Sequence, residues 1–290
     1  MDPALPALDG VRHRDVTVDG IRLHVAEAGE GPAVVLQHGW PQHWWAWRDV
    51  LPALAQRHRV ICPDLRGLGW SQGGGRDAGA KERLASDLLG VLDALNVDRC
   101  VLAGHDWGGF AGFLACLHAP ERFSGYLAMS ILHPWPTGNR PDPRALPRAA
   151  YQMVIATPGL GSTLLRRPGV VERFLKVAGA GAWDAAALAR YTEVLTRPPA
   201  ADASVAIYRS FLLSELVPIM RGRYVAQRLE VPCRLLVGAE DPVITPDVVM
   251  GFEPFADDMA LEWVPGAGHW LPEERPELVV ERIGELAAAS

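Results

Sequence analysis

Residues 104–109 read Gly-His-Asp-Trp-Gly-Gly and place a carboxylate, Asp106, where it could act as a nucleophile. An apolar run of strand character, 100–103, precedes this hexapeptide, and an apolar run of helical character, 110–117, follows it. A nucleophile between small residues at a strand-to-helix turn is typical of a nucleophile elbow. The glycines allow the tight turn that lifts the central side chain above a sheet.

A carboxylate at the centre of the elbow restricts the chemistry. Most such elbows carry serine, which catalyses acyl transfer. The carboxylate of Asp106 cannot catalyse ordinary acyl transfer. A carboxylate can attack an sp³ carbon and form an ester, which indicates epoxides or alkyl halides rather than esters or amides. Asp and Gly are also common in plain turns, so the prediction depends on partner residues elsewhere in the chain.

A histidine is the first partner that this chemistry needs. An ester on Asp106 must be hydrolysed, and histidine is suited to activate water because its pKa lies near neutrality. His269 follows a strand-like run, 260–264, and the small residues 266–268. It also lies C-terminal to all other candidates, which predicts His269 as the base.

The second partner is an acid that fixes the tautomer of the histidine and stabilises its charged form. Asp241 follows a strand-like run, 234–237, with Glu240 as its local competitor, although Asp-Pro could also simply begin a turn. The order Asp106, Asp241, His269 is nucleophile, acid, histidine. All three follow predicted strands, where open α/β sheets place their sites.

Backbone N–H groups should hold the oxyanion that forms when the ester is hydrolysed. One candidate is the N–H of Trp107, directly after the nucleophile. The other is the N–H of Trp40, in the loop 37–41 that follows another predicted strand. His38 and Pro41 are expected to shape this loop rather than to react.

The elements that must position these residues alternate between strand and helix, which predicts an α/β fold with a mostly parallel sheet flanked by helices. Residues 12–18 and 21–28 alternate polar and apolar around Asp19-Gly20, so a type I′ hairpin should add an antiparallel edge. The other expected strands are 33–37, 59–63, 100–103, 125–131, 231–238 and 260–264, and the expected helices are 44–56, 81–96, 110–117 and 276–288.

The alternation stops near Pro134. Residues 134–223 are rich in proline, alanine and arginine, with helical patches but no clear strand. The simplest organisation is a core domain formed by residues 1–133 and 224–290, with residues 134–223 inserted as a helical cap, or lid. No internal repeat is visible.

Composition excludes several classes of function. The chain has 290 residues, 49% hydrophobic and 21% charged, with a net charge of −6 that gives no reason to expect nucleic acid. We expect no stretch long and apolar enough to span a membrane, and no signal peptide. Four cysteines with apolar neighbours indicate reduced packing residues in a cytoplasmic protein, namely Cys62, Cys100, Cys116 and Cys233. No zinc spacing occurs, so neither a metal nor another cofactor is implied.

The glycine-rich segment 67–75 lacks the Gly-Lys-Ser/Thr of a phosphate-binding loop, and no dinucleotide fingerprint opens the first helix. Considered by itself, it is expected to be a flexible surface loop.

Taken together, three motifs resemble those of epoxide hydrolases of the α/β-hydrolase superfamily. Residues 38–41 match the H-G-x-P motif of that family, residues 64–71 match its D-x-R-G-x-G-x-S turn, and residues 104–109 match its G-H-D-W-G-G elbow. The resemblance covers the core almost end to end and implies an α/β-hydrolase fold. Related dehalogenases share the first two motifs, so these do not fix the substrate.

The resemblance also implies a pair of lid tyrosines, which hydrogen-bond the epoxide oxygen and donate a proton as the ring opens. Tyr151, before a Pro-Gly at 158–159, resembles the first, and Tyr208, before an arginine, resembles the second. Each could instead be a half-buried tyrosine whose hydroxyl is in contact with water. Tyr191 is the alternative candidate for either position. The expected substrate pocket comprises Trp40, Trp107, Gln152 and Trp270.

The sequence therefore predicts a hydrolase that opens a small-molecule epoxide with water, with a homodimer as a possible assembly. A haloalkane dehalogenase with the same triad is the first alternative, with Trp107 and one of Trp40, Trp135 or Trp183 as halide donors. A non-catalytic ligand-binding protein of the same fold is the second.

Overall fold

The fold is built on one eight-stranded sheet with the strand order β1-β2-β4-β3-β5-β6-β7-β8. The computed structural model describes residues 3–75, 77–137, 146–181 and 183–289. The pairs β1–β2 and β2–β4 are antiparallel, and all other neighbours are parallel. The strands are β1 Arg12–Val18, β2 Ile21–Ala28, β3 Ala33–Gln37, β4 Arg59–Pro63, β5 Cys100–His105, β6 Phe123–Met129, β7 Cys233–Gly238 and β8 Met259–Val264.

The sheet begins with the hairpin that the sequence predicts. Val18 pairs with Ile21 across Asp19 and Gly20, whose φ angles are 48° and 76°. Two consecutive residues with positive φ are what a type I′ turn requires, and Asp-Gly adopts them readily.

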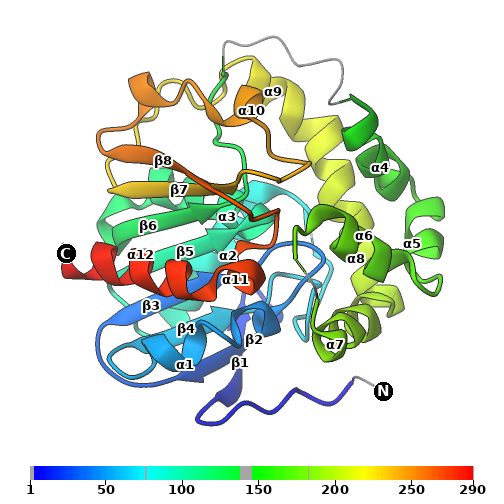
Figure 1. The fold of residues 1–290 in the computed structure, drawn as a ribbon, viewed down its shortest axis with the longest axis horizontal. Helices are drawn as coiled ribbons and strands as arrows, with labels where there is room; N and C mark the ends of the chain where they lie inside the picture. The colour runs from blue at the N-terminus through cyan, green and yellow to red at the C-terminus, as the bar shows by residue number, and fades with distance from the viewer. Residues whose placement is uncertain (1–2, 76, 138–145, 182, 290) are drawn as a thin grey trace.

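Helices cover both faces of the sheet (Figure 1) and bury two apolar cores. Successive side chains of a strand point to opposite faces, so Val34 and Leu36 of β3 join one core and Val35 joins the other. The core helices are α1 Leu51–Leu54, α2 Lys81–Ala94, α3 Asp106–His118, α10 Pro246–Val249, α11 Leu271–Glu274 and α12 Pro276–Ala288, with 3₁₀ turns η1 Trp44–Trp47, η2 Pro120–Arg122 and η5 Glu253–Phe255.

The predicted helix over 44–56 is interrupted in the structure. The 3₁₀ turn η1 and the short α1 stand in its place. Pro52 lies in the first turn of α1, where its missing N–H is tolerated. Proline further inside a helix would remove an intrahelical hydrogen bond, which explains why η1 and α1 do not form one continuous helix.

The segment between β6 and β7 is helical throughout much of its described length. Figure 1 shows these helices packed together beside one end of the sheet, and we refer to this group as the cap. The cap helices are α4 Leu146–Ala156, α5 Leu160–Leu165, α6 Val170–Ala178, α7 Ala185–Leu195, α8 Pro198–Ser210, the π-helical turn η4 Phe211–Glu215 and α9 Leu216–Met220.

The expectation that no stretch could span a membrane needs one correction. Helices α8, η4 and α9 run end to end over Pro198–Met220, which is long and apolar enough by length and composition. A helix packed inside a folded domain passes the same test, and α8 packs against α4, α5 and α7. One such helix is therefore weak evidence for a membrane span.

The expectation of a flexible surface loop at 67–75 is wrong for its first half. Residues 67–71 are buried. A Cβ on Gly69 would lie 2.2 Å from the carboxyl carbon of Asp64, and φ at Gly69 is 56°, so glycine is required there. The reason for the burial is the role of Asp64, described below.

Candidate active site

Asp106 lies at the junction of β5 and α3 with a φ of 49°, in the left-handed region that non-glycine residues rarely adopt. This turn lifts the carboxylate off the sheet. The surrounding backbone approaches very closely, since a Cβ on Gly39 would lie 2.3 Å from Cβ of Asp106. A Cβ on Gly108 would lie 2.2 Å from the carbonyl oxygen of His38. Small residues are therefore needed on both sides of the elbow.

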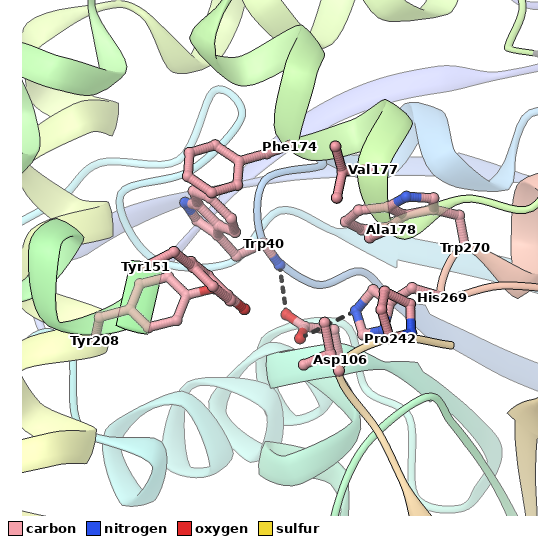
Figure 2. A pocket seen from close by; sticks show the side chains of 11 residues that line it. Trp40, Asp106, Tyr151, Phe174, Val177, Ala178, Tyr208, Pro242, His269 and Trp270 are labelled. Atoms are coloured by element: carbon pink, nitrogen blue, oxygen red, sulfur yellow. Dashed lines mark hydrogen bonds and ion pairs between the residues drawn. The ribbon is translucent and has the colours of Figure 1, made fainter. Parts of the chain in front are cut away.

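The structure brings the three residues of the predicted triad together. His269 Nε2 lies 3.5 Å from Asp106 Oδ2, and His269 Nδ1 lies 2.8 Å from Asp241 Oδ2 (Figure 2 shows the Asp106 contact). The other oxygen of Asp241 accepts the backbone N–H groups of Val243 and Ile244, at 2.7 and 3.0 Å. Its neighbour Glu240 is exposed, so Asp241 is the acid that faces the histidine.

The charges of this triad stabilise one another. Burial opposes the charge on His269, but Asp241 and Asp106 outweigh it and raise the His269 pKa to about 10. Burial also opposes ionisation of Asp106, and the contact with His269 nevertheless lowers its pKa. In the free protein the imidazolium thus lies between two carboxylates. If Asp106 became a neutral ester, His269 would lose one of them and its pKa would fall.

A backbone donor is aligned with the nucleophile. The N–H of Trp40 donates to Asp106 Oδ1 at 2.8 Å (Figure 2). The backbone N–H of Trp107 also hydrogen-bonds the carboxylate and favours its ionised form. Both groups are therefore placed where an oxyanion derived from the Asp106 carboxyl group would form.

The loop of Trp40 is held by buried polar contacts. His38 donates from Nδ1 to the carbonyl of Gly39 at 2.9 Å and accepts the N–H of Leu65 at Nε2, also at 2.9 Å. This arrangement requires the neutral tautomer, in agreement with burial lowering the His38 pKa. His38 therefore shapes the loop and does not react.

Asp64 connects this loop with the D-x-R-G-x-G-x-S turn. Its carboxylate accepts the N–H groups of Trp44 and Trp70, at 2.8 and 3.0 Å, and His24 Nδ1 lies 2.7 Å from the same group. Burial opposes its ionisation, but His24, together with His38 and His43, lowers the Asp64 pKa to about 2. The turn motif is thus a structural support behind the Trp40 loop, and the burial of residues 67–71 follows from it.

The cap places two tyrosines over Asp106. Tyr151 of α4 and Tyr208 of α8 have ring centroids 6.0 Å apart, and Figure 2 shows both on the Trp40 side of the carboxylate. The two hydroxyls lie close enough for each to influence the pKa of the other. Burial raises the Tyr151 pKa to about 12 and also raises the Tyr208 pKa, with the charge of Asp106 adding to both. Both phenols therefore keep their protons at neutral pH and can act as donors.

A cavity of about 280 Å³ lies between these groups. Its lining includes Asp106, His269 and both tyrosines, together with the predicted pocket residues Trp40 and Trp270. The other two predicted pocket residues, Gln152 and Trp107, are not among its lining. Gln152 lies beside the hydroxyl of Tyr151, and the ring of Trp107 packs against Phe110 and Phe211.

Several lining residues were not predicted from the sequence. They are Phe174, Val177 and Ala178 of α6, and Pro242 and Val243 after the acid. The spacing of the apolar residues in 170–178 predicts an amphipathic helix, but only the folded cap shows which face meets the core. Tyr191, the alternative candidate, lies elsewhere and donates its hydroxyl to Glu273. Within the described residues no group of three or more His, Cys, Asp or Glu is placed to hold a metal ion.

Comparison with known proteins agrees with this geometry. Residues 32–160 match the family model of the alpha/beta hydrolase fold. The chain is 30% identical to epoxide hydrolase A of Mycobacterium tuberculosis (strain ATCC 25618 / H37Rv), over 95% of each chain. It is 28% identical to the AB hydrolase superfamily protein YfhM of Bacillus subtilis (strain 168), over 96% of this chain and 98% of that one. The solved structure of epoxide hydrolase CorEH without ligand matches with a TM-score of 0.85 at 25% identity, over 96% of this chain and 99% of that one.

The sheet, the elbow and the family-model match define a hydrolase of the α/β-hydrolase class. Within that class, the full-length similarity shows that the chain belongs to the epoxide hydrolase family.

Proposed function

We propose that this protein opens epoxides to vicinal diols through an ester on Asp106. The observation that carries the proposal is the facing pair in one cavity, with the Asp106 carboxylate on one side and the hydroxyls of Tyr151 and Tyr208 on the other. An epoxide needs both groups at once, because a departing alkoxide is strongly basic. The relatives named epoxide hydrolases support the same substrate class.

In the first step, an Asp106 oxygen attacks a ring carbon and forms a C–O bond as the C–O bond of the epoxide breaks. The oxygen that leaves the carbon takes a proton from a tyrosine. In this proposal Tyr151 and Tyr208 are the donors, and their proximity lets one stabilise the phenolate left on the other.

In the second step, His269 first passes its proton to the phenolate, because its pKa falls once Asp106 is a neutral ester. Water then attacks the carbonyl carbon of the ester, and the neutral His269 takes a proton from it. The backbone N–H groups of Trp40 and Trp107 hold the oxyanion, and Asp241 stabilises the imidazolium. Collapse releases the diol and the Asp106 carboxylate; the second proton of the water completes the diol, and His269 is again an imidazolium. Epoxide and water are the only reactants consumed.

Dehalogenation is less well supported. A halide leaving group needs N–H donors that face the cavity. The indole N–H of Trp40 donates to Ser204 Oγ at 2.9 Å, and the ring of Trp107 is not part of the cavity lining. The two tyrosine hydroxyls, in contrast, suit an oxygen leaving group.

A single turnover in ¹⁸O-water tests the covalent route. The diol formed first should carry unlabelled oxygen from Asp106, while a labelled diol would indicate direct attack by water. A panel of styrene oxide, aliphatic epoxides and 1-haloalkanes tests the substrate class. Consumption of haloalkanes alone would favour the dehalogenase, and the absence of any covalent adduct would favour a non-catalytic binding protein.

We also propose residues 1–133 and 224–290 as the catalytic core and residues 134–223 as a cap that supplies the proton donors. A cytoplasmic location is our further proposal, supported by four cysteines that are all free and buried.

A further inference from the structure

Lys81 is a buried cation that the reaction described above does not use. The chain has only two lysines among its 28 basic residues. Lys176 is 55% exposed and pairs with Glu172 on the surface of α6, whereas the side chain of Lys81 is 1% exposed. Lysine is rarely buried to this extent unless it is paired. The partners of Lys81 should therefore indicate its role.

The contacts of Lys81 cross from the core to the cap. Its Nζ donates to the carbonyl of Ile207 at 2.6 Å and lies 3.2 Å from Glu215 Oε2. Its backbone N–H donates to Glu215 Oε1 at 2.8 Å. Lys81 is the first residue of α2 in the core, while Ile207 and Glu215 belong to α8 and η4 of the cap. Side chain and backbone of Lys81 thus hold the same end of α8.

This end of α8 is irregular. The N–H of Phe211 is shared between the carbonyls of Ile207 and Tyr208, and the N–H of Leu216 donates to Phe211 in the π-helical turn. The Ile207 carbonyl therefore accepts only a shared hydrogen bond from the Phe211 N–H, and it accepts a second hydrogen bond from the ammonium of Lys81. Such π-helical turns are frequent at functional sites.

The backbone before Lys81 fits against the same turn of α8. A Cβ on Gly79 would lie 2.2 Å from the carbonyl of Ala206, so the two backbones touch directly. Lys81 Nζ also donates to the Gly79 carbonyl at 3.1 Å. The segment 79–81 therefore determines the position of the turn of α8 that leads into Tyr208.

The ammonium also contacts the ring that adjoins Tyr208. Lys81 Nζ lies 4.4 Å from the ring centroid of Trp107, in a cation–π contact. The Trp107 and Tyr208 rings are 5.7 Å apart. Burial lowers the Lys81 pKa to about 8, against the opposing effect of Glu215, so the group is mostly charged at neutral pH.

We propose that Lys81, held by Glu215, is a positioning residue for epoxide opening that fixes Tyr208 where its phenol donates to the leaving oxygen. Lys81 does not line the cavity and acts through α8 and Trp107. The inference rests on the proposed function, since it assigns Lys81 to the first step alone. Ester hydrolysis depends on His269, Asp241 and the backbone donors. Lys81 contacts the indole ring of Trp107 and not its backbone N–H, so ester hydrolysis should not depend on Lys81.

The test compares the two steps in single-turnover experiments, with the mass of the Asp106 ester as the readout. Lys81→Met should slow alkylation by about 10- to 100-fold, because misplacement by an ångström has effects of this size. The rate of ester hydrolysis should stay at the wild-type value. Lys176→Met is the matched control and should change neither step. If the unpaired Glu215 prevents Lys81→Met from folding, the double variant Lys81→Met/Glu215→Gln removes both charges and should show the same split.

Addition of Lys81→Met to Tyr208→Phe distinguishes positioning from a general structural role. If Lys81 acts through Tyr208, the second substitution should slow alkylation no further. Equal slowing of both steps, an unchanged alkylation rate, or a full additional loss in the Tyr208→Phe background would each overturn the inference. A wild-type protein that does not consume epoxides would overturn the proposed function itself, whereas normal wild-type turnover with an unaffected Lys81→Met would overturn the inference alone.

Discussion

The core half of the site is held by its own backbone, whereas the cap half depends on contacts across a boundary. Asp106, Asp241 and His269 all follow strands of the sheet, namely β5, β7 and β8. The backbone N–H groups of Val243 and Ile244 then fix the acid. The positions of Asp106 and Asp241 therefore depend on elements that the core itself supplies, whereas His269 also bonds the cap through its backbone N–H.

The two tyrosines stand on cap helices, and the cap meets the core near the site through a few hydrogen bonds. The indole N–H of Trp40 donates to Ser204, and the backbone N–H of His269 donates to the Ala178 carbonyl at 2.8 Å. The indole N–H of Trp270 adds a bond of 2.7 Å to a carbonyl of α6. The position of the phenols relative to Asp106 thus depends on how the cap is seated.

This difference separates the two proposed steps. Ester hydrolysis uses groups of the core alone, while ring opening needs a carboxylate from the core and a phenol from the cap. A change in how the tyrosines on α4 and α8 sit should therefore slow alkylation much more than hydrolysis of an existing ester. Within the cap, Tyr208 stands on the helix that contacts the core through Lys81 and Trp40, while Tyr151 stands on α4, which packs mainly on α8 and α5.

The largest effect should come from the nucleophile. Asp106→Asn should reduce turnover by about 10⁴-fold or more, because the covalent step disappears. Asparagine tolerates the positive φ of this position better than most residues, so the thermal unfolding curve should stay close to that of the wild type. Steady-state diol formation and the absence of a mass increase are the measurements. Substantial remaining turnover would show that Asp106 is not the nucleophile.

Loss of the base should block only the step that belongs to the core. His269→Gln should still be alkylated, and the ester should accumulate because water activation falls by about 10²–10⁴-fold. Intact-protein mass spectrometry should show an increase of one substrate mass. Asp241→Asn should slow the same step less completely. A His269→Gln protein that remains unmodified after long incubation with substrate would contradict this division of roles.

The His269→Gln variant should also change the pH dependence of alkylation. Burial raises the pKa of Asp106, whereas the contact with His269 lowers it and prevails. Without His269 the Asp106 pKa should rise, so less carboxylate is ionised at mildly acidic pH. The alkylation rate of His269→Gln should therefore begin to fall at a higher pH than that of the wild type as the solution is acidified. If the alkylation rates of the two proteins fell over the same acidic pH range in single-turnover experiments, His269 would not be lowering the Asp106 pKa.

Phenylalanine substitutions test the cap side of the comparison. Tyr151→Phe and Tyr208→Phe should each slow alkylation by about 10-fold, since one donor remains, and together by about 10²–10⁴-fold. Hydrolysis of a preformed ester should change little in all three variants. Rapid-mixing measurements of ester formation and decay separate the steps. If the double variant were alkylated by epoxides at the wild-type rate, the two tyrosines would not be the proton donors.

The core could be predicted from the sequence because local signals determine it. Continuous apolar runs such as Ala33–Gln37 mark buried parallel strands, and Asp19-Gly20 marks the hairpin. Chain order and strand ends then point to Asp106, Asp241 and His269, which the structure brings together. Each of these signals needs only a few neighbouring residues.

The cap could not be predicted to the same depth, since its geometry depends on contacts between distant segments. The spacing of α6 predicts a helix but not that Phe174 and Val177 line the cavity of Asp106. The same limit applies to the buried residues 67–71 of the core, whose position depends on the bonds that Asp64 accepts from distant backbone. The partnership of Lys81 with Ile207 joins residues 126 positions apart.

The smallest effect on catalysis should come from Tyr191, a cap tyrosine that contacts the core away from the cavity. It is buried, and its hydroxyl donates to Glu273, which also pairs with Arg48 at 2.6 Å. Tyr191→Phe should leave alkylation and ester hydrolysis at wild-type rates. It should lower the free energy of unfolding by about 1–2 kcal/mol, because Glu273 loses one hydrogen bond but keeps Arg48. Urea denaturation measures the loss, with Tyr208→Phe as the comparison for rates. If Tyr191→Phe slowed alkylation more than Tyr208→Phe, the donor would be Tyr191, and the assignment of the cap half of the site would have to be reversed.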